Sequence, residues 1–395
     1  MIAAFQADGN NVHYKAGIDE VPVYGPSMGY VIGEETALTR LCEQRLMMST
    51  GAQTDLFTST VQSHGKPSLV GSAVDITSGH GGTYPRSNRL SDGSLIATYT
   101  TSSNGNSQIA FARSTDGGAS WTLKSTAATR PGASSDLDNP YVLQLPSGRL
   151  IVAYRNHDKN PSTGAYTFFR ITLSYSDDSG ATWKYLSDPA SDPAGPNGNW
   201  EPFLRNALDG SLQLYYSREN AQNDQDNLMR TSLDGGSTWS SARMVSGKSV
   251  TSRDGMIGVA TVTGSGVIAV FENTEDGRYS IDSMTSSDDG KTWGNRRRVY
   301  TPTGNGNNAG APQVINVGGT LVVSFMTDED TQLGQWISGA SGKLVTSVDG
   351  GATWGDKIEV FASQANWPGM VGLDDSNFLY MSDMSGAKSV QVALT

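Results

Sequence analysis

The octapeptide STDGGASW, residues 114–121, decides the fold, because the chain repeats it four more times. The further copies begin at residues 176, 232, 286 and 347 and read SDDSGATW, SLDGGSTW, SSDDGKTW and SVDGGATW. Each copy keeps Ser, Asp, Gly and Trp at its first, third, fifth and eighth positions. Self-similarity at a spacing of 54 to 62 residues indicates an architecture built by repeating one small structural unit. We call this octapeptide the box.

A hairpin pattern alternates with the box. It consists of an apolar stretch, a tight turn and a second apolar stretch that in five of the six copies ends in an aromatic residue. The six copies are NRLSDGSLIATY (88–99), LQLPSGRLIVAY (143–154), NALDGSLQLYY (206–216), ATVTGSGVIAVF (260–271), INVGGTLVVSF (315–325) and VGLDDSNFLYM (371–381). Asp-Gly and Gly-Gly between alternating apolar runs are strong hairpin signals. A repeat of this length with four short strands is typical of a propeller blade. The sequence therefore predicts an all-β fold, a six-bladed β-propeller.

The two ends of the chain are predicted to share the sixth blade. The sequence has six hairpins but only five boxes. After the last hairpin, KSVQVALT (388–395) suffices for a third strand and no more. The fourth strand of blade six must then come from the N-terminal side, within PSLVGSAVDI (67–76). Closing the ring in this way removes exposed sheet edges.

A shared tripeptide, usually containing Pro, precedes each hairpin and marks the start of the innermost strand. Pro is tolerated at the first residues of a strand, where its missing N–H costs no ladder bond. The six copies are Tyr84-Pro85-Arg86, Asn139-Pro140-Tyr141, Glu201-Pro202-Phe203, Asp254-Gly255-Met256, Ala311-Pro312-Gln313 and Trp367-Pro368-Gly369.

The chain reverses direction between successive strands of a blade, so counting these reversals shows at which face of the propeller each turn lies. The boxes lie at the turn between the third and fourth strands, on the face opposite the starts of the innermost strands. Their Ser and Asp side chains can bind the N–H groups of that turn, and five copies around a ring cannot converge on one ligand. We therefore expect the boxes to be structural and the functional site to lie on the other face.

Composition excludes several classes of partner. A net charge of −11 without any Lys/Arg block argues against nucleic acid and against anionic membranes. No apolar run approaches the roughly 20 residues that span a bilayer. The four His residues show no ligand spacing, so we expect no metal and no cofactor, and we expect a monomer.

The N-terminal part of the chain carries no blade signature. We expect residues 1–55 to form an extension of unknown role and residues 56–395 to form the propeller, with a helical pattern only at residues 36–48. The start, MIAAFQADGNN, lacks the basic and apolar regions of a secretory signal peptide.

Two glutamates are the candidate catalytic pair. Glu201 lies at the start of the innermost strand of blade three, and Glu272 ends the second strand of blade four, so both should reach the same funnel. Paired carboxylates beside Arg and aromatic groups suit glycoside hydrolysis, in which one protonates the leaving oxygen and the other attacks or activates water. Candidate substrate-binding residues on the same face are Arg86, Asn139, Arg155, Trp200, Tyr216, Arg218, Arg253, Asp254 and Trp367.

The boxes resemble the Asp-box repeats of the sialidase superfamily, which specify a fold better than a function. More specific are WEPF (200–203), YYSREN (215–220), SRDGM (252–256) and VFE (270–272), which together resemble glycoside hydrolase family 93, the exo-α-1,5-L-arabinanases. The resemblance covers roughly residues 67–395. In Arg253-Asp254 the order is reversed relative to the family's Asp-Arg stretch, which leaves the role of both residues open.

This resemblance implies an extracellular enzyme that acts on plant cell-wall arabinan or a related oligosaccharide. The family releases arabinobiose with retention of configuration and uses two Glu residues, which correspond to Glu201 and Glu272. Which of the two is the nucleophile and which the acid/base is not decided by the sequence, although we favour Glu201 as the nucleophile.

Two alternatives stay open. A sialidase would need three Arg residues for the substrate carboxylate, a Tyr nucleophile and an Asp acid from the first blade. Arg86 could supply the first Arg, but GAPQV of blade five has none, Trp367 stands where a Tyr is wanted, and TSSNGNSQ after the first hairpin has no acid. The second alternative is a non-catalytic propeller that binds glycan or protein.

Overall fold

The computed structural model describes residues 5–8, 11–14, 65–193, 195, 198–331 and 336–395. The chain divides into two units, residues 1–60 and 61–395. In the first unit, β1 (Phe5–Asp8) and β2 (Asn11–Tyr14) form an antiparallel pair. The expected helical pattern at residues 36–48 lies outside the described residues, and the proposed boundary at residue 55 stays a prediction. Within the described residues no helix is long and apolar enough to cross a membrane.

The second unit is a β-propeller of six antiparallel four-stranded sheets, as predicted. Blade one contains β4 (Thr83–Arg89), β5 (Leu95–Ser103), β6 (Asn106–Ser114) and β7 (Thr122–Pro131). Blade two contains β8 (Ser135–Gln144), β9 (Leu150–Lys159), β10 (Tyr166–Ser176) and β11 (Lys184–Pro193). Blade three contains β12 (Asn199–Asn206), β13 (Leu212–Ala221), β14 (Asp224–Ser232) and β15 (Arg243–Ser246).

The remaining three blades repeat the same antiparallel order. Blade four contains β16 (Gly255–Thr263), β17 (Gly266–Asn273), β18 (Ser280–Ser286) and β19 (Gly294–Tyr300). Blade five contains β20 (Ala309–Val317), β21 (Thr320–Thr327), β22 (Ser341–Ser347) and β23 (Gly355–Phe361). Blade six contains β24 (Asn366–Gly372), β25 (Asn377–Asp383), β26 (Ala387–Leu394) and β3 (Pro67–Asp75).

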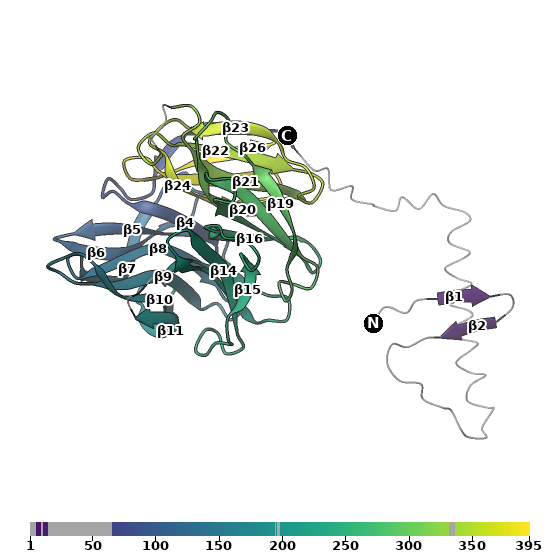
Figure 1. Ribbon diagram of the computed structural model, residues 1–395, viewed down its shortest axis with the longest axis horizontal. Coiled ribbons are helices and arrows are strands. Elements are labelled where there is room, and N and C mark those ends of the chain that lie inside the picture. Colours follow the sequence, from purple (N-terminus) through teal and green to yellow (C-terminus); the bar gives the residue numbers. More distant parts are fainter. Residues whose placement is uncertain (1–4, 9–10, 15–64, 194, 196–197, 332–335) are drawn as a thin grey trace, which may run out of the picture. The chain divides into compact units, whose positions relative to one another are not determined.

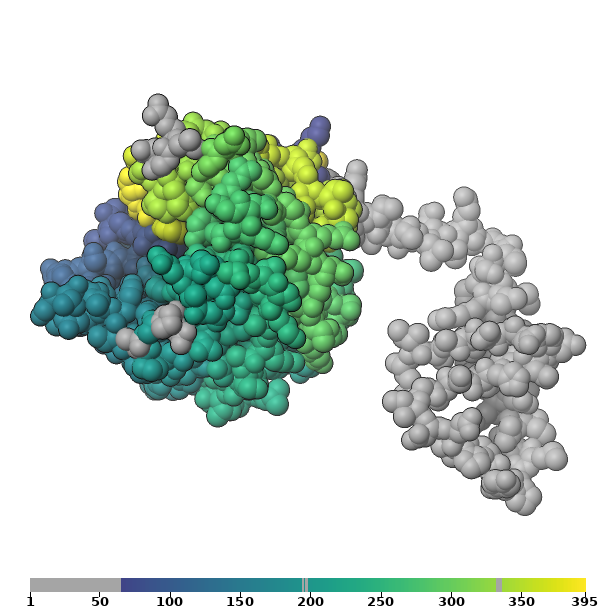
Figure 2. Space-filling view, viewed as in Figure 1, coloured from purple at the N-terminus to yellow at the C-terminus, as the bar shows by residue number. Residues whose placement is uncertain are grey.

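The innermost strands form a closed ring. Each of β4, β8, β12, β16, β20 and β24 contacts the next, and β24 contacts β4. Figure 1 shows the sheets following one another in colour, from the blue-purple strands of blade one to the yellow strands of blade six. In the space-filling view the yellow of blade six lies against the blue of blade one (Figure 2). The starts of all six innermost strands therefore meet at one face of the ring.

Blade six joins the two ends of the propeller. Strand β26 pairs with β25 on one side and with β3 on the other, in a register that sets Val392 opposite Leu69 and Lys388 opposite Asp75. The predicted closure by residues 67–76 is thus confirmed. Since β3 is the outermost strand, its pairing with β26 completes the last sheet with a segment more than 300 residues away in sequence.

The core lies between neighbouring blades, because each sheet is covered on both faces. Between blades one and two, for example, Ile96 and Phe111 pack with Val152 from the next sheet. The ring of Phe111 stacks on Trp183, the box tryptophan of blade two, at 4.3 Å. Burial of such side chains stabilises each blade contact by about 25 cal/mol per Å² of apolar area.

The boxes are structural, as predicted. In the box of blade three, Asp234 accepts the N–H and the hydroxyl of Thr238 at 2.8 and 2.6 Å, and Ser232 donates its hydroxyl to Asp234 at 2.8 Å. These hydrogen bonds favour the ionised form and lower the pKa of Asp234 to about 2. Trp239 then reaches back to blade two, where its indole N–H donates to Ser187 at 3.2 Å. Each box thus fixes its own turn, and in three boxes the indole of Trp121, Trp183 or Trp239 also donates to a Ser of the neighbouring blade.

Asp234→Ala is expected to destabilise the propeller without altering the site on the opposite face. The change removes the acceptor of two hydrogen bonds from Thr238 and costs about 1 kcal/mol, which corresponds to a melting temperature lower by roughly 2 °C. Calorimetry measures it. Asp375→Ala is the control, since that exposed turn side chain makes no hydrogen bond with the described residues. A loss of function at unchanged melting temperature would contradict the structural role.

Candidate active site

A bulge at the start of every innermost strand aims one side chain at the axis of the ring. In all six blades the pairing with the second strand shifts at this point, as between Trp200 and Phe203 in blade three. The bulged residue has a φ between +43° and +53°, which is rare for a residue with a side chain. These axial residues are Tyr84, Asn139, Glu201, Met256, Ala311 and Trp367. A bulge re-aims a side chain in this way.

The bulge corrects the alignment made from the sequence. Asp254 was placed as the counterpart of Glu201, but the positive φ of blade four falls on Met256. Blade four lacks the Pro that marks the bulge in the other five blades, so its register was shifted by two residues. Met256, not an acid, is therefore the axial residue of blade four.

Glu201 and Glu272 come from neighbouring blades, three and four. Glu201 is the axial residue of β12, and Glu272 lies on β17 opposite Gly255. Oε2 of Glu272 accepts the N–H of Ala311 from blade five at 2.7 Å. Oε2 of Glu201 is buried and accepts no hydrogen bond from the described residues. The Glu272 carboxyl is thus fixed by the backbone, whereas one oxygen of Glu201 remains available.

Two glycines make room for the Glu272 carboxyl. A Cβ at Gly310 would lie 2.5 Å from Oε2 of Glu272, and a Cβ at Gly255 would lie 3.5 Å from Oε1. Both positions correspond to Trp200 of blade three, where a large side chain is present. Absence of a side chain at Gly310 is therefore required for the hydrogen bond between Glu272 and Ala311.

Burial raises the pKa of both glutamates to about 7. For Glu201, burial is the largest cause and the Glu272 carboxylate adds to it, while Arg155 and Arg253 oppose the rise. For Glu272, burial is again largest, opposed by the N–H of Ala311 and by Arg253. Two acids that affect each other titrate as a pair. Near neutral pH the pair can hold a single proton, which is the state that acid/base chemistry between two carboxyls requires.

Arginines line the polar side of the site, but acids neutralise them. Arg155 binds Asp138 at 2.8 Å and Asp136 at 3.1 Å, and its guanidinium lies 5.1 Å from the ring centre of Trp200. Arg253 donates to Glu219 at 2.6 Å. Arg155 and Arg253 thus lie near enough to act on Glu201, and neither is free of an acid partner. The ring of Trp200, the residue before Glu201, packs against His157 and Arg155, and a role of these residues in binding substrate stays a prediction.

The other side of the floor is aromatic and apolar. Tyr84 stacks on Trp367 with ring centres 4.6 Å apart and an angle of 18° between the planes. Met256, Ala311 and the partly buried Trp336 pack in the same cluster. Such a surface suits the apolar C–H face of a sugar ring and offers no cationic group to a carboxylate. The floor therefore combines this apolar cluster with polar side chains, and Glu272 lies at the border between them, since it accepts the N–H of Ala311.

Arg86 lies below this floor and not in the funnel. It is only 7% exposed, and its Nη1 donates to the main-chain oxygens of Pro85 and Trp367 at 2.9 and 3.0 Å. With Asn139 and Glu201 it lines an axial cavity of about 10 Å³, room for roughly one water molecule. Burial lowers the pKa of Arg86 to about 10. Arg86 thus shares only this small cavity with Glu201 and cannot contact a ligand in the funnel without rearrangement.

Two further predicted binding residues do not join the site, and the binding role of a third, Arg218, stays a prediction. Tyr216 is 2% exposed and packs in the core between blades two and three. Asp254 is fully buried and gives both carboxylate oxygens to Arg296, at 2.6 and 3.1 Å. Arg218 stands at the end of β13, 3.7 Å from Asp192 and partly exposed. The predicted contact with substrate is therefore wrong for two residues. Tyr216 is packed in the core, and the carboxylate of Asp254 is paired with Arg296.

Other residues of the site were missed. Tyr279 stands beside both glutamates, whose charges raise its pKa together with burial, the largest cause. Its ring lies parallel to that of Trp336, with centres 5.9 Å apart. Tyr279 follows a turn and Trp336 lies in one, and both belong to connections outside the hairpin and box motifs. Among the missed residues, only Tyr84 could have been found from the sequence, because Pro85 after it marks the start of the innermost strand of blade one.

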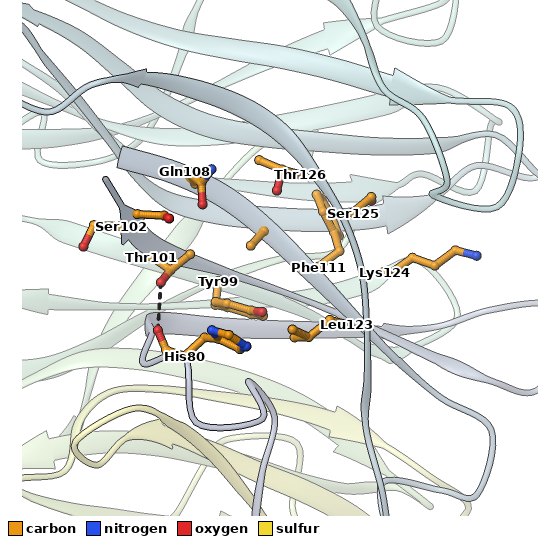
Figure 3. A pocket seen from close by; sticks show the side chains of 12 residues that line it. His80, Tyr99, Thr101, Ser102, Gln108, Phe111, Leu123, Lys124, Ser125 and Thr126 are labelled. Carbon is orange, nitrogen blue, oxygen red and sulfur yellow. Dashed lines mark hydrogen bonds between the residues drawn. The ribbon is translucent and has the colours of Figure 1, made fainter. Parts of the chain in front are cut away.

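A larger cavity lies elsewhere, on the flank of blade one. It has a volume of about 350 Å³ and is lined by His80 and by residues of β5, β6 and β7, including Tyr99, Leu123 and Lys124. Figure 3 shows Thr101 donating its hydroxyl to the main-chain oxygen of His80, at 3.2 Å. No acidic residue lines it, so this cavity carries no acid/base pair. Within the described residues no group of three or more His, Cys, Asp or Glu side chains could hold a metal ion.

Known structures share this fold. The sequence itself matches no family model and no curated protein. An α-L-arabinanase of Penicillium chrysogenum, solved with arabinobiose, is 20% identical with a TM-score of 0.63 and covers 83% of this chain and 99% of its own. The family-93 α-L-arabinofuranosidase of Fusarium graminearum, also with arabinobiose, is 21% identical with a TM-score of 0.64, covering 82% and 98%. An intramolecular trans-sialidase of Ruminococcus gnavus is 13% identical with a TM-score of 0.55, covering 81% and 96%.

Gly310→Ala is expected to displace the Glu272 carboxyl. The new Cβ would overlap Oε2, so the hydrogen bond from the Ala311 N–H would be lost. That hydrogen bond favours the charged form, and its loss should raise the pKa of Glu272 above about 7. Carboxyl titration by NMR measures the shift. Gly372→Ala is the control, because a Cβ there meets nothing within 4 Å. An unchanged titration in Gly310→Ala would contradict this packing.

Proposed function

We propose that the protein is a glycoside hydrolase of family 93 that cleaves α-1,5-linked L-arabinan, acting from the chain end and releasing arabinobiose with retention of configuration. The observation that carries the proposal is the pair Glu201 and Glu272, both with a pKa raised to about 7 and both beside an aromatic floor. The two arabinan-related structures support the same substrate class by their bound arabinobiose.

The reaction needs one carboxylate and one carboxylic acid at the same time. In a retaining mechanism the carboxylate attacks the anomeric carbon while the acid protonates the departing glycosidic oxygen. The acid, now ionised, then takes a proton from water, which attacks the glycosyl-enzyme bond and releases the sugar. We assign the attack to Glu201, which has a free oxygen, and proton transfer to Glu272. The separation of about 5–5.5 Å that retention requires remains part of the proposal.

The charge of the floor favours a neutral substrate. A sialoside carries a carboxylate that needs unpaired guanidinium groups. Here Arg155 and Arg253 are bound to acids, and Arg86 lies beneath the floor. Tyr84 and Trp367 instead present stacked aromatic rings. These observations count against sialidase activity, although the sialidase fold is similar.

A purely binding propeller would not need the raised pKa values. Burying two acids side by side costs free energy, and such strained pairs cluster at catalytic centres. Plant cell-wall arabinan is a polymer outside the cell, so we also propose that the protein acts extracellularly. A monomer suffices for the proposed reaction, since both glutamates come from one chain.

Activity should follow a bell-shaped pH profile centred near neutral. Below the two apparent pKa values both carboxyls are protonated and no nucleophile exists. Above them both are ionised and no proton donor exists. Each limb of kcat/KM against pH, measured on an arabino-oligosaccharide, reports the pair and not a single residue. A profile that stays flat from pH 5 to pH 9 would contradict a role for the pair.

Glu201→Gln and Glu272→Gln should each lower kcat by about a thousandfold or more. The two variants should differ on an aryl substrate with an activated leaving group. Glu272→Gln can still form the glycosyl-enzyme, and azide should restore its turnover with an azide adduct as product. Glu201→Gln should not respond in that way.

Glu359→Gln is the matched control, because Glu359 is exposed on the outer strand β23. If azide instead restores Glu201→Gln, the two roles are exchanged. If both variants keep near-normal turnover, the pair is not the catalytic one.

A further inference from the structure

A third cavity lies across blades five and six and shares Trp336 with the apolar cluster of the site. Its volume is about 610 Å³, within the range of about 300–1,000 Å³ typical of small-molecule sites. It is lined by Trp336, Ile337, Gln364, Asn366, Asp383 and Ser385. We call it the recess. None of the motifs in the sequence marks it.

The recess continues from the floor of the site on the side of Glu272. Trp336 packs against Gly310, where a Cβ would lie 3.1 Å from its ring, and Gly310 in turn borders Oε2 of Glu272. Asn366 directly precedes the axial residue Trp367. A chain lying across the two glutamates could therefore extend past Glu272 and Trp336 into the recess.

The polar side chains of the recess are one carboxylate, two amides and two hydroxyls, with no cationic group among them. Oδ1 of Asn366 is buried and accepts no hydrogen bond from the described residues. Asp383 stands opposite Asn366 on β25 and is held by the N–H of Gly386 at 3.2 Å. No Lys or Arg lines the recess. An anionic ligand would be repelled by Asp383, whereas the hydroxyl groups of a neutral sugar could donate to both acceptors.

An aromatic platform completes the recess. Trp336 is half-buried, and its ring lies parallel to Tyr279, so its orientation is fixed. The neighbouring Ile337 is 42% exposed and adds apolar surface. A fixed indole beside two hydrogen-bond acceptors suits a sugar ring, whose C–H face packs on the aromatic plane while its hydroxyls point outward.

We propose that the recess binds a sugar residue of a neutral saccharide chain on the leaving-group side of the bond that is cleaved, with Trp336 as the stacking platform and Asn366 and Asp383 as acceptors of its hydroxyls. The inference rests on the proposed function for the position of the bond and for Glu272 as proton donor. It makes the protein selective for a polymer over a glycoside with a small leaving group.

Trp336→Ala tests the recess with two kinds of substrate. The first is a linear α-1,5-arabino-oligosaccharide long enough to fill it, and the second an aryl α-arabinobioside, whose small leaving group does not fill it. Trp336 also packs against the floor beside Glu272, so both substrates can lose activity, but loss of the platform should lower kcat/KM about tenfold more on the oligosaccharide than on the aryl substrate. Asp383→Asn should show the same split to a smaller extent.

Tyr185→Ala is the control, since this tyrosine is equally aromatic but lies 64% exposed on outer strand β11 of blade two. Equal losses on both substrates, or no loss on either, would overturn the proposal. Melting temperatures show whether Trp336→Ala is folded. If it is not, the difference between the two substrates is measured with Asp383→Asn instead.

Failure of the recess is distinguishable from failure of the proposed function. If the wild-type protein cleaves neither arabinoside, the function falls, and the recess is judged by calorimetric titration with the arabino-oligosaccharide and, separately, a linear xylo-oligosaccharide. Saturable binding that Trp336→Ala weakens by about tenfold would keep the recess as a saccharide site. Binding of neither chain, or binding that Trp336→Ala leaves unchanged, would overturn it.

Discussion

The main-chain bulge at the start of each innermost strand is the constraint on which the site depends. It holds one residue per blade at a φ near +50° and turns that side chain toward the axis. Proline after the bulge in five of the blades fixes the direction of the chain at this point. The strain of six such residues, of order 1–3 kcal/mol each, is sustained by the closed ring, in which every sheet packs between two others. Glu201 reaches the axis because it is the bulged residue of blade three.

A divided floor follows from which residues occupy the six axial positions. Asn139 and Glu201 stand on blades two and three, whereas Met256, Ala311, Trp367 and Tyr84 continue around the ring. The acids thus gather where Arg155 and Arg253 balance them only in part, and burial keeps both glutamates near the pKa at which they can share a proton. The apolar side chains of the other axial positions lie next to them and offer packing without charge. This separation lets one funnel hold a neutral sugar and act on its linkage.

The sequence was sufficient for the architecture because turns and repeats are local signals. Asp-Gly and Gly-Gly turns fixed the hairpins, and the missing sixth box pointed to the closing strand at residues 67–76. Side-chain direction was harder to foresee, because sheets buried on both faces hide the alternation that separates core from site. Tyr215 and Tyr216 are both buried, so no pattern showed that Tyr216 faces a neighbouring blade. The bulge adds one residue to the innermost strand, and in blade four no Pro marks its position in the sequence. Asp254 was therefore aligned with Glu201 in place of Met256. Tyr279 and Trp336 reach the site from connections that carry no motif.

The most direct test is to follow one digest of linear α-1,5-arabinan by proton NMR, with a sialoside digest in parallel. We expect arabinobiose as the first product, in the same anomeric configuration as the polymer, and no sialic acid. Release of sialic acid, or an arabinan product of inverted configuration, would contradict the account of a retaining pair on a floor built for a neutral sugar.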